Sequence, residues 1–396
     1  MEGLFLKRYH TASCNRNYLS LLSVSGEDWS VCENDEPIML PFARNSTIDG
    51  SSCGELMYFD NFGGRIIICN PTTKSFVPLD PPKFPRPPVT IIFCGSGFGY
   101  DPISDDYKVV RHYYHSYFEC IKDPGREPNN VAEVYSLKNG SWKEILGPFD
   151  DEDDDDDGIC FVPTDCMTGI YVDGVCYWTS CVGVISFDFT HELFSSFDLP
   201  MKNKDGDFLH NLIKVNDVLG VFRNERPPTC YPKYVEFSST FELLVRKESS
   251  WVPWLNVDLS NDVRRPLLLF NEGQFLFLEK QVHEHIYQLV VYDFKAKKLT
   301  ELDVYDFPEM MTIMPHVETR FPLWFPIPMD GFYSKDEEKE ENNDRILEWR
   351  RKRWMRIRRI KRKTKIMMKM KIRLKWWIML KNYMKRAIRA DSMYHG

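Results

Sequence analysis

The sequence predicts an all-β fold, a kelch-like β-propeller of about six irregular four-stranded blades followed by a basic C-terminal extension. Aromatic residues, which favour strands, make up 14% of the chain. Apolar residues at helical spacing are nearly absent from residues 18–325. A hairpin-like unit also recurs along the chain, and such a repeat explains how 396 residues can form one large β domain.

The recurring unit is an apolar or aromatic residue, a tight polar turn, and a large apolar residue seven positions after the first. The copies are Leu22–Trp29, Cys69–Phe76, Tyr135–Trp142, Phe187–Phe194, Leu244–Trp251 and Tyr292–Leu299. Their starts at 22, 69, 135, 187, 244 and 292 lie 47, 66, 52, 57 and 48 residues apart, close to the length of propeller blades. Each unit is interpreted as a hairpin, because a polar turn joins two strand-like runs.

A second hairpin pattern adjoins most copies of the unit. These patterns are Gly54–Ile68, Gly97–Tyr114, Ile170–Phe187, Leu212–Phe222 and Leu267–Leu278. Two hairpins for each repeat predict four strands in a blade.

Several segments interrupt the strand pattern and are predicted to be loops. Residues 150–157 are eight consecutive acids, which cannot pack, and residues 78–89 contain too many prolines for a central strand. Because loops carry specificity in such folds, the candidate target-binding segments are residues 112–131, 147–168, 200–210 and 223–233.

The charge distribution divides the chain. Residues 345–396 contain 20 Lys and Arg against 2 acids, giving +18, so the first 344 residues carry −7 − 18 = −25. We therefore expect an acidic linker at 326–344 and a basic tail at 345–396, helical or disordered. An acidic body favours a protein partner over nucleic acid. The tail is interpreted either as a patch that touches nucleic acid or an anionic membrane, or as an unstructured extension.

The cysteines and the N-terminal residues predict a cytoplasmic or nuclear protein. The eleven cysteines include no CxxC pair, which suits buried thiols in a reducing compartment. The first residues lack a signal-peptide core, and no apolar run reaches the length of a membrane span.

The candidate metal ligands are His112 with His115, the triplet of His283, Glu284 and His285, and one group of cysteines. That group is Cys160, Cys166, Cys176 and Cys181. Neither histidine pair has a third ligand at suitable spacing, and the cysteines are spaced more widely than those of zinc knuckles. We therefore interpret them as ordinary strand or surface residues.

No catalytic, cofactor-binding or metal-binding residue is predicted, and the chain is not expected to be an enzyme. The glycine-rich segment Cys94–Asp101 lacks the GK[ST] of a phosphate-binding loop, and its glycines are interpreted as turn residues. No GxSxG or HExxH motif occurs. A propeller that binds or cleaves glycans is the alternative from another class, because a catalytic carboxylate pair need not be close in sequence.

Several motifs, in order along residues 4–320, resemble the F-box-associated type 1 domain of plants, including the S-locus F-box group. They are Leu6–Ser23, Ile68–Pro82, Gly97–Val110, Glu133–Ile145, Gly169–Ser180, Ile185–Pro200 and Val290–Leu302. The resemblance implies a propeller at 18–325 that selects target proteins for a cullin-based ubiquitin ligase of the SCF type. It also implies that a strand within 312–324 pairs with the first blade and closes the ring.

In this family an N-terminal F-box binds a Skp-type adaptor, and residues 1–17 resemble a remnant of the segment that follows an F-box. No F-box pattern occurs in the chain. A Skp-type adaptor and a cullin are therefore expected as partners only if an F-box is supplied upstream. A non-ligase scaffold or a competitor that binds the same target is the remaining alternative.

Overall fold

The structure is a computed structural model of the chain, which divides into two units, Met1–Met329 and Asp330–Gly396. It describes residues 2–10, 16–25, 28–31, 37–42, 48–61, 65–79, 91–115, 131–147, 168–180, 183–200, 208–225, 240–259, 263–271, 273–283, 286–306 and 311–318. All of these belong to the first unit, so the predicted linker and basic tail lie outside the described residues. No helix among the described residues is long and apolar enough to cross a membrane.

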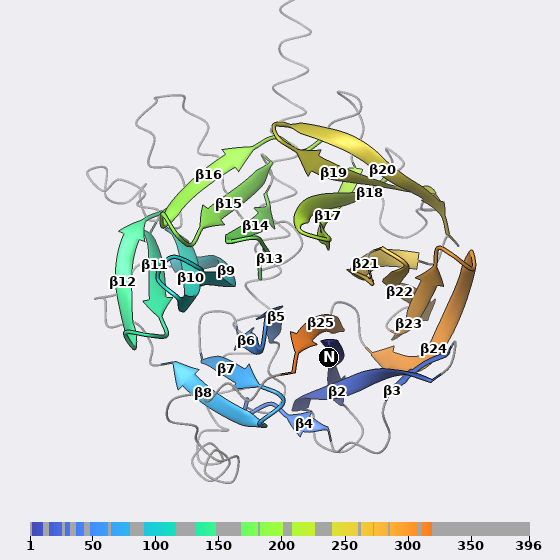
Figure 1. The fold of residues 1–396 in the computed structure, drawn as a ribbon, viewed down its shortest axis with the longest axis horizontal. Coiled ribbons are helices and arrows are strands. Elements are labelled where there is room, and N and C mark those ends of the chain that lie inside the picture. The colour runs from blue at the N-terminus through green and yellow to red at the C-terminus, as the bar shows by residue number, and fades with distance from the viewer. Residues whose placement is uncertain are drawn as a thin grey trace, which may run out of the picture. The chain divides into compact units, whose positions relative to one another are not determined.

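The first unit is a propeller of six antiparallel sheets set around a ring, which confirms the predicted fold (Figure 1). Blade I contains β25 (Thr312–Val317), β1 (Glu2–His10), β2 (Arg16–Ser25) and β3 (Asp28–Val31), with β4 (Ile38–Met39) paired to β2. Blade II contains β5 (Asp49–Cys53), β6 (Leu56–Asp60), β7 (Ile66–Asn70) and β8 (Ser75–Leu79). Blade III contains β9 (Ile91–Asp101), β10 (Asp106–His115), β11 (Val131–Ser136) and β12 (Ser141–Leu146).

The remaining three blades have the same strand order from the centre outward. Blade IV contains β13 (Ile170–Val172), β14 (Val175–Thr179), β15 (Val184–Asp188) and β16 (Leu193–Phe197). Blade V contains β17 (Phe208–Val215), β18 (Val218–Glu225), β19 (Thr240–Lys247) and β20 (Ser250–Asp258). Blade VI contains β21 (Val263–Phe270), β22 (Phe275–His283), β23 (Ile286–Asp293) and β24 (Lys298–Asp306).

The recurring sequence unit forms the outer hairpin of every blade, between its third and fourth strands. In four blades the first and the last residue of the unit are cross-strand partners. These pairs are Cys69 with Phe76, Tyr135 with Trp142, Phe187 with Phe194, and Tyr292 with Leu299. In blade I the partner of Trp29 is Val24, and in blade V the two-residue turn between Lys247 and Ser250 places Arg246 opposite Trp251. The spacing therefore predicts the hairpin everywhere and the register in most blades.

The residue that opens the outer turn explains why the turn forms. The Oδ1 atom of Asp188 accepts hydrogen bonds from the backbone N–H groups of Thr190 and His191. Asn70 and Asp293 act in the same way in blades II and VI. Such side chains satisfy backbone donors that the turn leaves without a strand partner.

The ring is closed by its two ends, as the resemblance implied. Strand β25 pairs antiparallel with β1, with Glu2 opposite Val317 and Lys7 opposite Thr312. The expectation that residues 1–17 precede the propeller is wrong at Glu2–His10, which is a strand of blade I. The alternating Leu4 and Leu6 are 2% and 0% exposed, so this segment contributes to the core between blades VI and I.

The glycines of the segment Cys94–Asp101 lie within β9, so their interpretation as turn residues is wrong. A Cβ atom on Gly97 would come within 2.6 Å of the Cys176 Sγ atom, and one on Gly99 within 2.3 Å of the Phe189 ring. Glycine is required because blade IV packs directly against this strand.

Candidate recognition face

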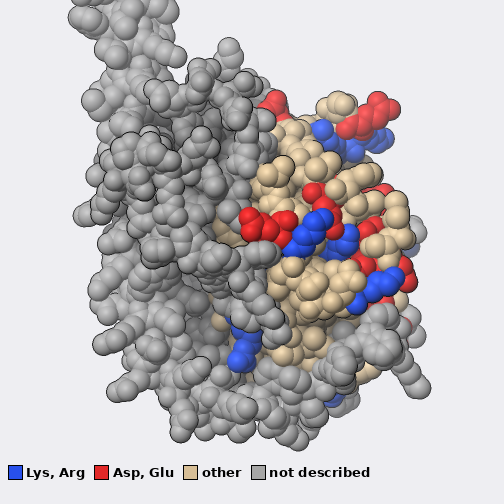
Figure 2. All heavy atoms as spheres, turned by 90° about the vertical axis from the view of Figure 1, so that its left-hand side faces the viewer, with Lys and Arg blue, Asp and Glu red and all other residues tan. Residues whose placement is uncertain are grey.

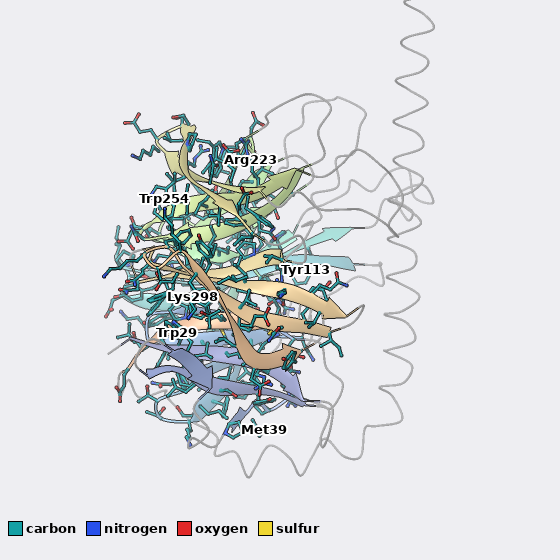
Figure 3. All side chains as sticks on the ribbon, turned by 90° about the vertical axis from the view of Figure 1, so that its right-hand side faces the viewer. Trp29, Met39, Tyr113, Arg223, Trp254 and Lys298 are labelled. Atoms are coloured by element: carbon teal, nitrogen blue, oxygen red, sulfur yellow. The ribbon has the colours of Figure 1, made fainter. Side chains whose placement is uncertain are left out.

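The two ends of the blades differ in how their strands are connected. At one end, the turn face, tight turns join β9 to β10 through 102–105, β13 to β14 through 173–174, and β17 to β18 through 216–217. The antiparallel order sends the longer connections to the opposite end, the loop face. Figure 3 shows Tyr113 and Arg223 toward the loop face, and Trp254 and Lys298 toward the turn face.

All four predicted target-binding segments join strands at the loop face. Residues 116–130 connect β10 to β11, and residues 226–239 connect β18 to β19. The other two segments connect blade III to blade IV and blade IV to blade V. Most of each segment lies outside the described residues, but the strand ends that bear them are described. These strand ends show how the loop face is supported.

Arginine–glutamate pairs support the loop face in three blades. Arg223 and Glu242 are cross-strand partners, with Nε–Oε2 and Nη2–Oε2 distances of 2.8 and 2.5 Å. Arg265 and Glu279 are also partners, with an Nε–Oε2 distance of 2.6 Å. The side chains of both pairs are mostly or fully buried. Hydrogen bonds between charged groups of this kind fix strand ends more firmly than hydrogen bonds between neutral groups do.

Buried cations, two of them arginines of these pairs, also hold the connections between blades. Arg223 donates to the carbonyl of Pro200 at 2.9 Å, and Arg265 donates to that of Met311 at 3.1 Å. In blade I the Nζ atom of Lys7 donates to the carbonyl of Ile48 at 2.7 Å. Each carbonyl belongs to a segment between two named strands, so buried charges anchor the backbone where it enters a blade. Burial lowers the pKa of Lys7 from its ordinary value.

Arg111 forms the third arginine–glutamate pair and joins blade III to blade II. It is the cross-strand partner of Glu133, and its Nε atom lies 3.5 Å from the Asp60 carboxylate of blade II. Tyr58 donates to Asp60 at 2.9 Å, and Tyr113 donates to Glu133. Burial acts to lower the pKa of Arg111, but Asp60, Tyr113, Tyr58 and Glu133 together outweigh it and the pKa is raised. Arg111 is therefore a fixed cation at this junction.

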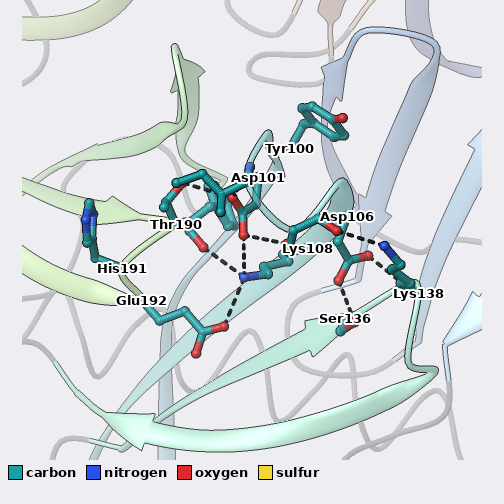
Figure 4. Close-up of polar contacts among 12 residues, drawn as sticks. Tyr100, Asp101, Asp106, Lys108, Ser136, Lys138, Thr190, His191 and Glu192 are labelled. Atoms are coloured by element: carbon teal, nitrogen blue, oxygen red, sulfur yellow. Dashed lines mark hydrogen bonds and ion pairs between the residues drawn. The ribbon is translucent and has the colours of Figure 1, made fainter.

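A separate polar network joins blades III and IV at the turn face (Figure 4). The Nζ atom of Lys108 donates to Asp101 at 2.9 Å, to Glu192 at 3.1 Å and to the Phe189 carbonyl at 3.0 Å. Burial acts to raise the pKa of Asp101, but hydrogen bonds from Ser104 and Lys108 hold it well below its usual range. Three of these residues, Asp101, Lys108 and Glu192, belong to sequence motifs that carry the family resemblance.

The exposed charges around blade III are of both signs. Figure 2 shows acidic and basic side chains interspersed on the described part of that side. Lys143 and Glu192, 2.9 Å apart, are one such pair. The described surface around blade III therefore has no excess of one charge that would attract a partner of the opposite charge.

The candidate metal ligands are not brought together where the structure describes them. His112 is buried against Trp178, with ring centroids 5.3 Å apart, and burial lowers its pKa to about 3. Cys176 is a buried free thiol. The side chains of His115, His283 and His285, and all of Cys160, Cys166 and Cys181, lie outside what is described. Among the described side chains no group of three His, Cys, Asp or Glu could hold a metal ion.

Sequence reasoning did not identify the arginine–glutamate pairs. Arg265 and Glu279 flank the hairpin between β21 and β22, so opposite charges on the two sides of a turn could have indicated them, although a register shift between Pro266 and Leu268 makes their distances from the turn differ by one residue. Arg111 and Glu133 are separated by a long connection. The sequence carries no comparable signal for that pair.

The chain is similar to one known domain family and to parts of known proteins. Residues 35–325 match the F-box associated beta propeller domain. Two relatives from Arabidopsis thaliana are F-box protein At4g22390, 33% identical over 23% of this chain and 25% of that protein, and F-box protein CPR1, 35% identical over 24% and 23%. The chain thus spans about a quarter of the length of these curated relatives.

Two bacterial proteins are among the solved structures that the comparison matched to this chain. TolB from Acinetobacter baumannii has a TM-score of 0.40 and 10% identity, over 80% of this chain and 66% of that one. Apo AztD from Citrobacter koseri has a TM-score of 0.39 and 9% identity, over 79% and 97%.

Proposed function

This chain belongs to the family of F-box associated β-propeller domains, and we propose that it is a protein-recognition module that binds a target protein with its loop face. The observation that carries the proposal is the difference between the two faces. Long connections leave only from the end of the blades whose strand ends and inter-blade carbonyls are held by Arg111, Arg223 and Arg265. Variable loops on a rigid support are the usual arrangement of a binding surface.

We further propose that the bound target is selected for ubiquitination when the propeller is joined to an F-box. The chain is similar to parts of F-box proteins, which supports this role. Strand β1 begins at the turn face, because Glu2 lies opposite Val317 at the end of β25. A domain fused ahead of Glu2 would therefore start at the face opposite the target-binding loops, and both partners could be bound together.

The test of target binding exchanges the loops and leaves the ring intact. Residues 116–130 and 226–239 are replaced by Gly-Ser linkers of the same length, singly and together, in the full chain. The matched control changes Lys295 and Lys297 to serine and glycine in the β23–β24 turn at the other face. Proteins that crosslink to each version in plant cells are quantified by mass spectrometry.

We expect the loop variants to lose the crosslinked target and the turn variant to keep it, with the crosslinks mapping to the exchanged segments. Equal recovery of the same target by all variants would contradict binding at the loop face.

The ligase role has its own test. The chain is expressed with and without an F-box fused ahead of Glu2, and the abundance of the crosslinked target is followed together with recovery of the adaptor and cullin. We expect adaptor and cullin with the fusion alone, and a lower abundance of the target. Unchanged target abundance with the fusion would leave the chain as a scaffold or competitor.

A further inference from the structure

Arg246 is stacked on aromatic rings at the junction of blades IV and V. Its guanidinium carbon lies 3.5 Å from the centroid of the Phe197 ring and 5.7 Å from that of Trp251. The Phe197 and Trp251 rings are 6.3 Å apart, and Tyr177 meets Phe197 edge-on at 6.2 Å. These rings come from β16, β20 and β14, so two blades together form the platform beneath the cation.

Arg246 differs from the arginines that serve the fold. Arg111, Arg223 and Arg265 each lie opposite a glutamate, whereas the cross-strand partner of Arg246 is Trp251. Within the described part of the chain, Arg246 makes no hydrogen bond and no ion pair. Burial lowers its pKa and Tyr177 raises it, and no carboxylate contributes to the shift. An arginine nevertheless stays charged at neutral pH.

Stacking leaves the hydrogen-bonding edge of the guanidinium available. The Phe197 ring covers one face of the planar group, whereas the N–H donors point outward within its plane. The side chain is half-buried, and the Trp251 Nε1 atom donates to the Asp198 carbonyl at 3.0 Å, which fixes the indole. The cation is thus held in place before any partner arrives, which reduces the entropy lost on binding.

We propose that Arg246, held by Phe197 and Trp251, binds an oxyanion on a partner protein, either the carboxylate of an acidic side chain or a phosphate. A planar fork without an internal carboxylate matches both groups, and it binds either through two parallel hydrogen bonds. The site lies on the outer strands of two blades, beside the turn between β19 and β20, and Phe197 is the last residue of β16, from which the chain continues into the predicted target-binding segment 200–210. The first 344 residues carry −25 and do not attract acidic peptides in general, whereas residues 345–396 carry +18, so binding through Arg246 is recognised by its loss when Arg246 is changed.

The test measures anisotropy of a fluorescein-labelled peptide of glutamates and glycines, and of a counterpart with phosphoserine in place of one glutamate. Both peptides are titrated with the full chain. We expect saturable binding with a Kd of about 1 mM or tighter to at least one peptide. Arg246→Gln should weaken it roughly 10- to 100-fold, because a hydrogen-bonded charge is lost. Arg246→Lys should have a smaller effect, because charge remains and the fork is lost.

Lys247→Gln is the matched control, since it makes the same charge change at the next, exposed residue. Binding should survive this change and should weaken in Phe197→Leu, which removes the stacking ring and no charge. The thermal midpoint of each variant is measured in parallel. The proposal is overturned if the unaltered chain shows no saturable binding of either peptide, or if Lys247→Gln weakens binding as much as Arg246→Gln does. The stronger of the two peptides identifies carboxylate or phosphate as the preferred group.

Discussion

Among the charged groups at the turn face, removal of Lys108 should lower the free energy of unfolding of the propeller most. Its side chain and that of Asp101 are 9% and 3% exposed, and the two are 2.9 Å apart. In Lys108→Met the Asp101 carboxylate stays buried without its cation. We expect a loss of about 3–5 kcal/mol in the free energy of unfolding, measured by urea denaturation, because an uncompensated buried charge is costly.

Lys143→Met is the control for this prediction. Lys143 also reaches Glu192, but its side chain is 70% exposed. Such a surface pair contributes about 1 kcal/mol or less. Similar losses in the two variants would contradict the view that Lys108 joins the blades through a buried charge.

His112 should make the propeller less stable in mild acid. Its pKa is about 3 in the folded chain, because burial disfavours the charged ring, against about 6.5 when unfolded. Below pH 6.5 the unfolded chain therefore binds a proton that the folded chain does not, and stability falls as the pH falls. Between pH 7 and pH 5 we expect about 2 kcal/mol to be lost through this group.

The measurement compares urea denaturation at the two pH values for the unaltered chain and for His112→Phe, in which the new ring can pack on Trp178 and Phe194. The variant should lose less stability on acidification. Any packing cost of the substitution cancels, because each protein is compared with itself. An equal loss in both proteins would contradict the assignment to His112.

At the scale of the element, the outer hairpin depends on the residue that opens its turn. The Oδ1 atom of Asp293 accepts from the N–H groups of Lys295 and Ala296. Asp293→Ala removes both bonds, and we expect a loss of about 1–2 kcal/mol by urea denaturation. Asp293→Asn should be nearly neutral, because Asn70 makes the same two contacts in blade II. A loss in Asp293→Asn as large as in Asp293→Ala would argue for charge rather than for turn geometry.

The outer hairpins could be predicted from the sequence because their defining contacts are local. Tyr292 and Leu299 are seven residues apart and also cross-strand partners, so the pattern and the pairing coincide. The role of Gly97 and Gly99 could not be predicted, since it depends on side chains of the next blade. Glu2–His10 was missed as a strand for the same reason, because one of its two partners is β25 at the other end of the ring.

The loop face, too, could be predicted from the sequence only where its features are local. Loop positions follow from composition, so the connections after β10 and β18 were recognisable. The arginines that hold them act through Asp60 of another blade or through carbonyls of other segments, such as that of Pro200. Contacts of this kind leave no periodicity in a single sequence.

At the scale of the whole molecule, the ring should fold only if its closing strand is present. Strand β25 supplies Ile313 and Met314, and Met311 precedes it; they are 5%, 1% and 0% exposed. Each buried side chain of this size contributes about 1.5–3 kcal/mol. A domain as a whole is stable by about 5–15 kcal/mol. A chain that ends at residue 310 should therefore not give a cooperative thermal transition by circular dichroism.

The matched truncation ends at Met329, the last residue of the first unit. It keeps β25, its pairing with β1, the hydrogen bond from Val317 to the Gly54 carbonyl, and the Thr72–His316 contact that links the closing strand to blade II. We expect this chain to unfold cooperatively with an unchanged midpoint, because none of these contacts requires residues 330–396. A large drop in its midpoint would mean that the second unit contributes to the stability of the propeller. A chain ending at residue 310 that matched it would show that blade I can close without β25.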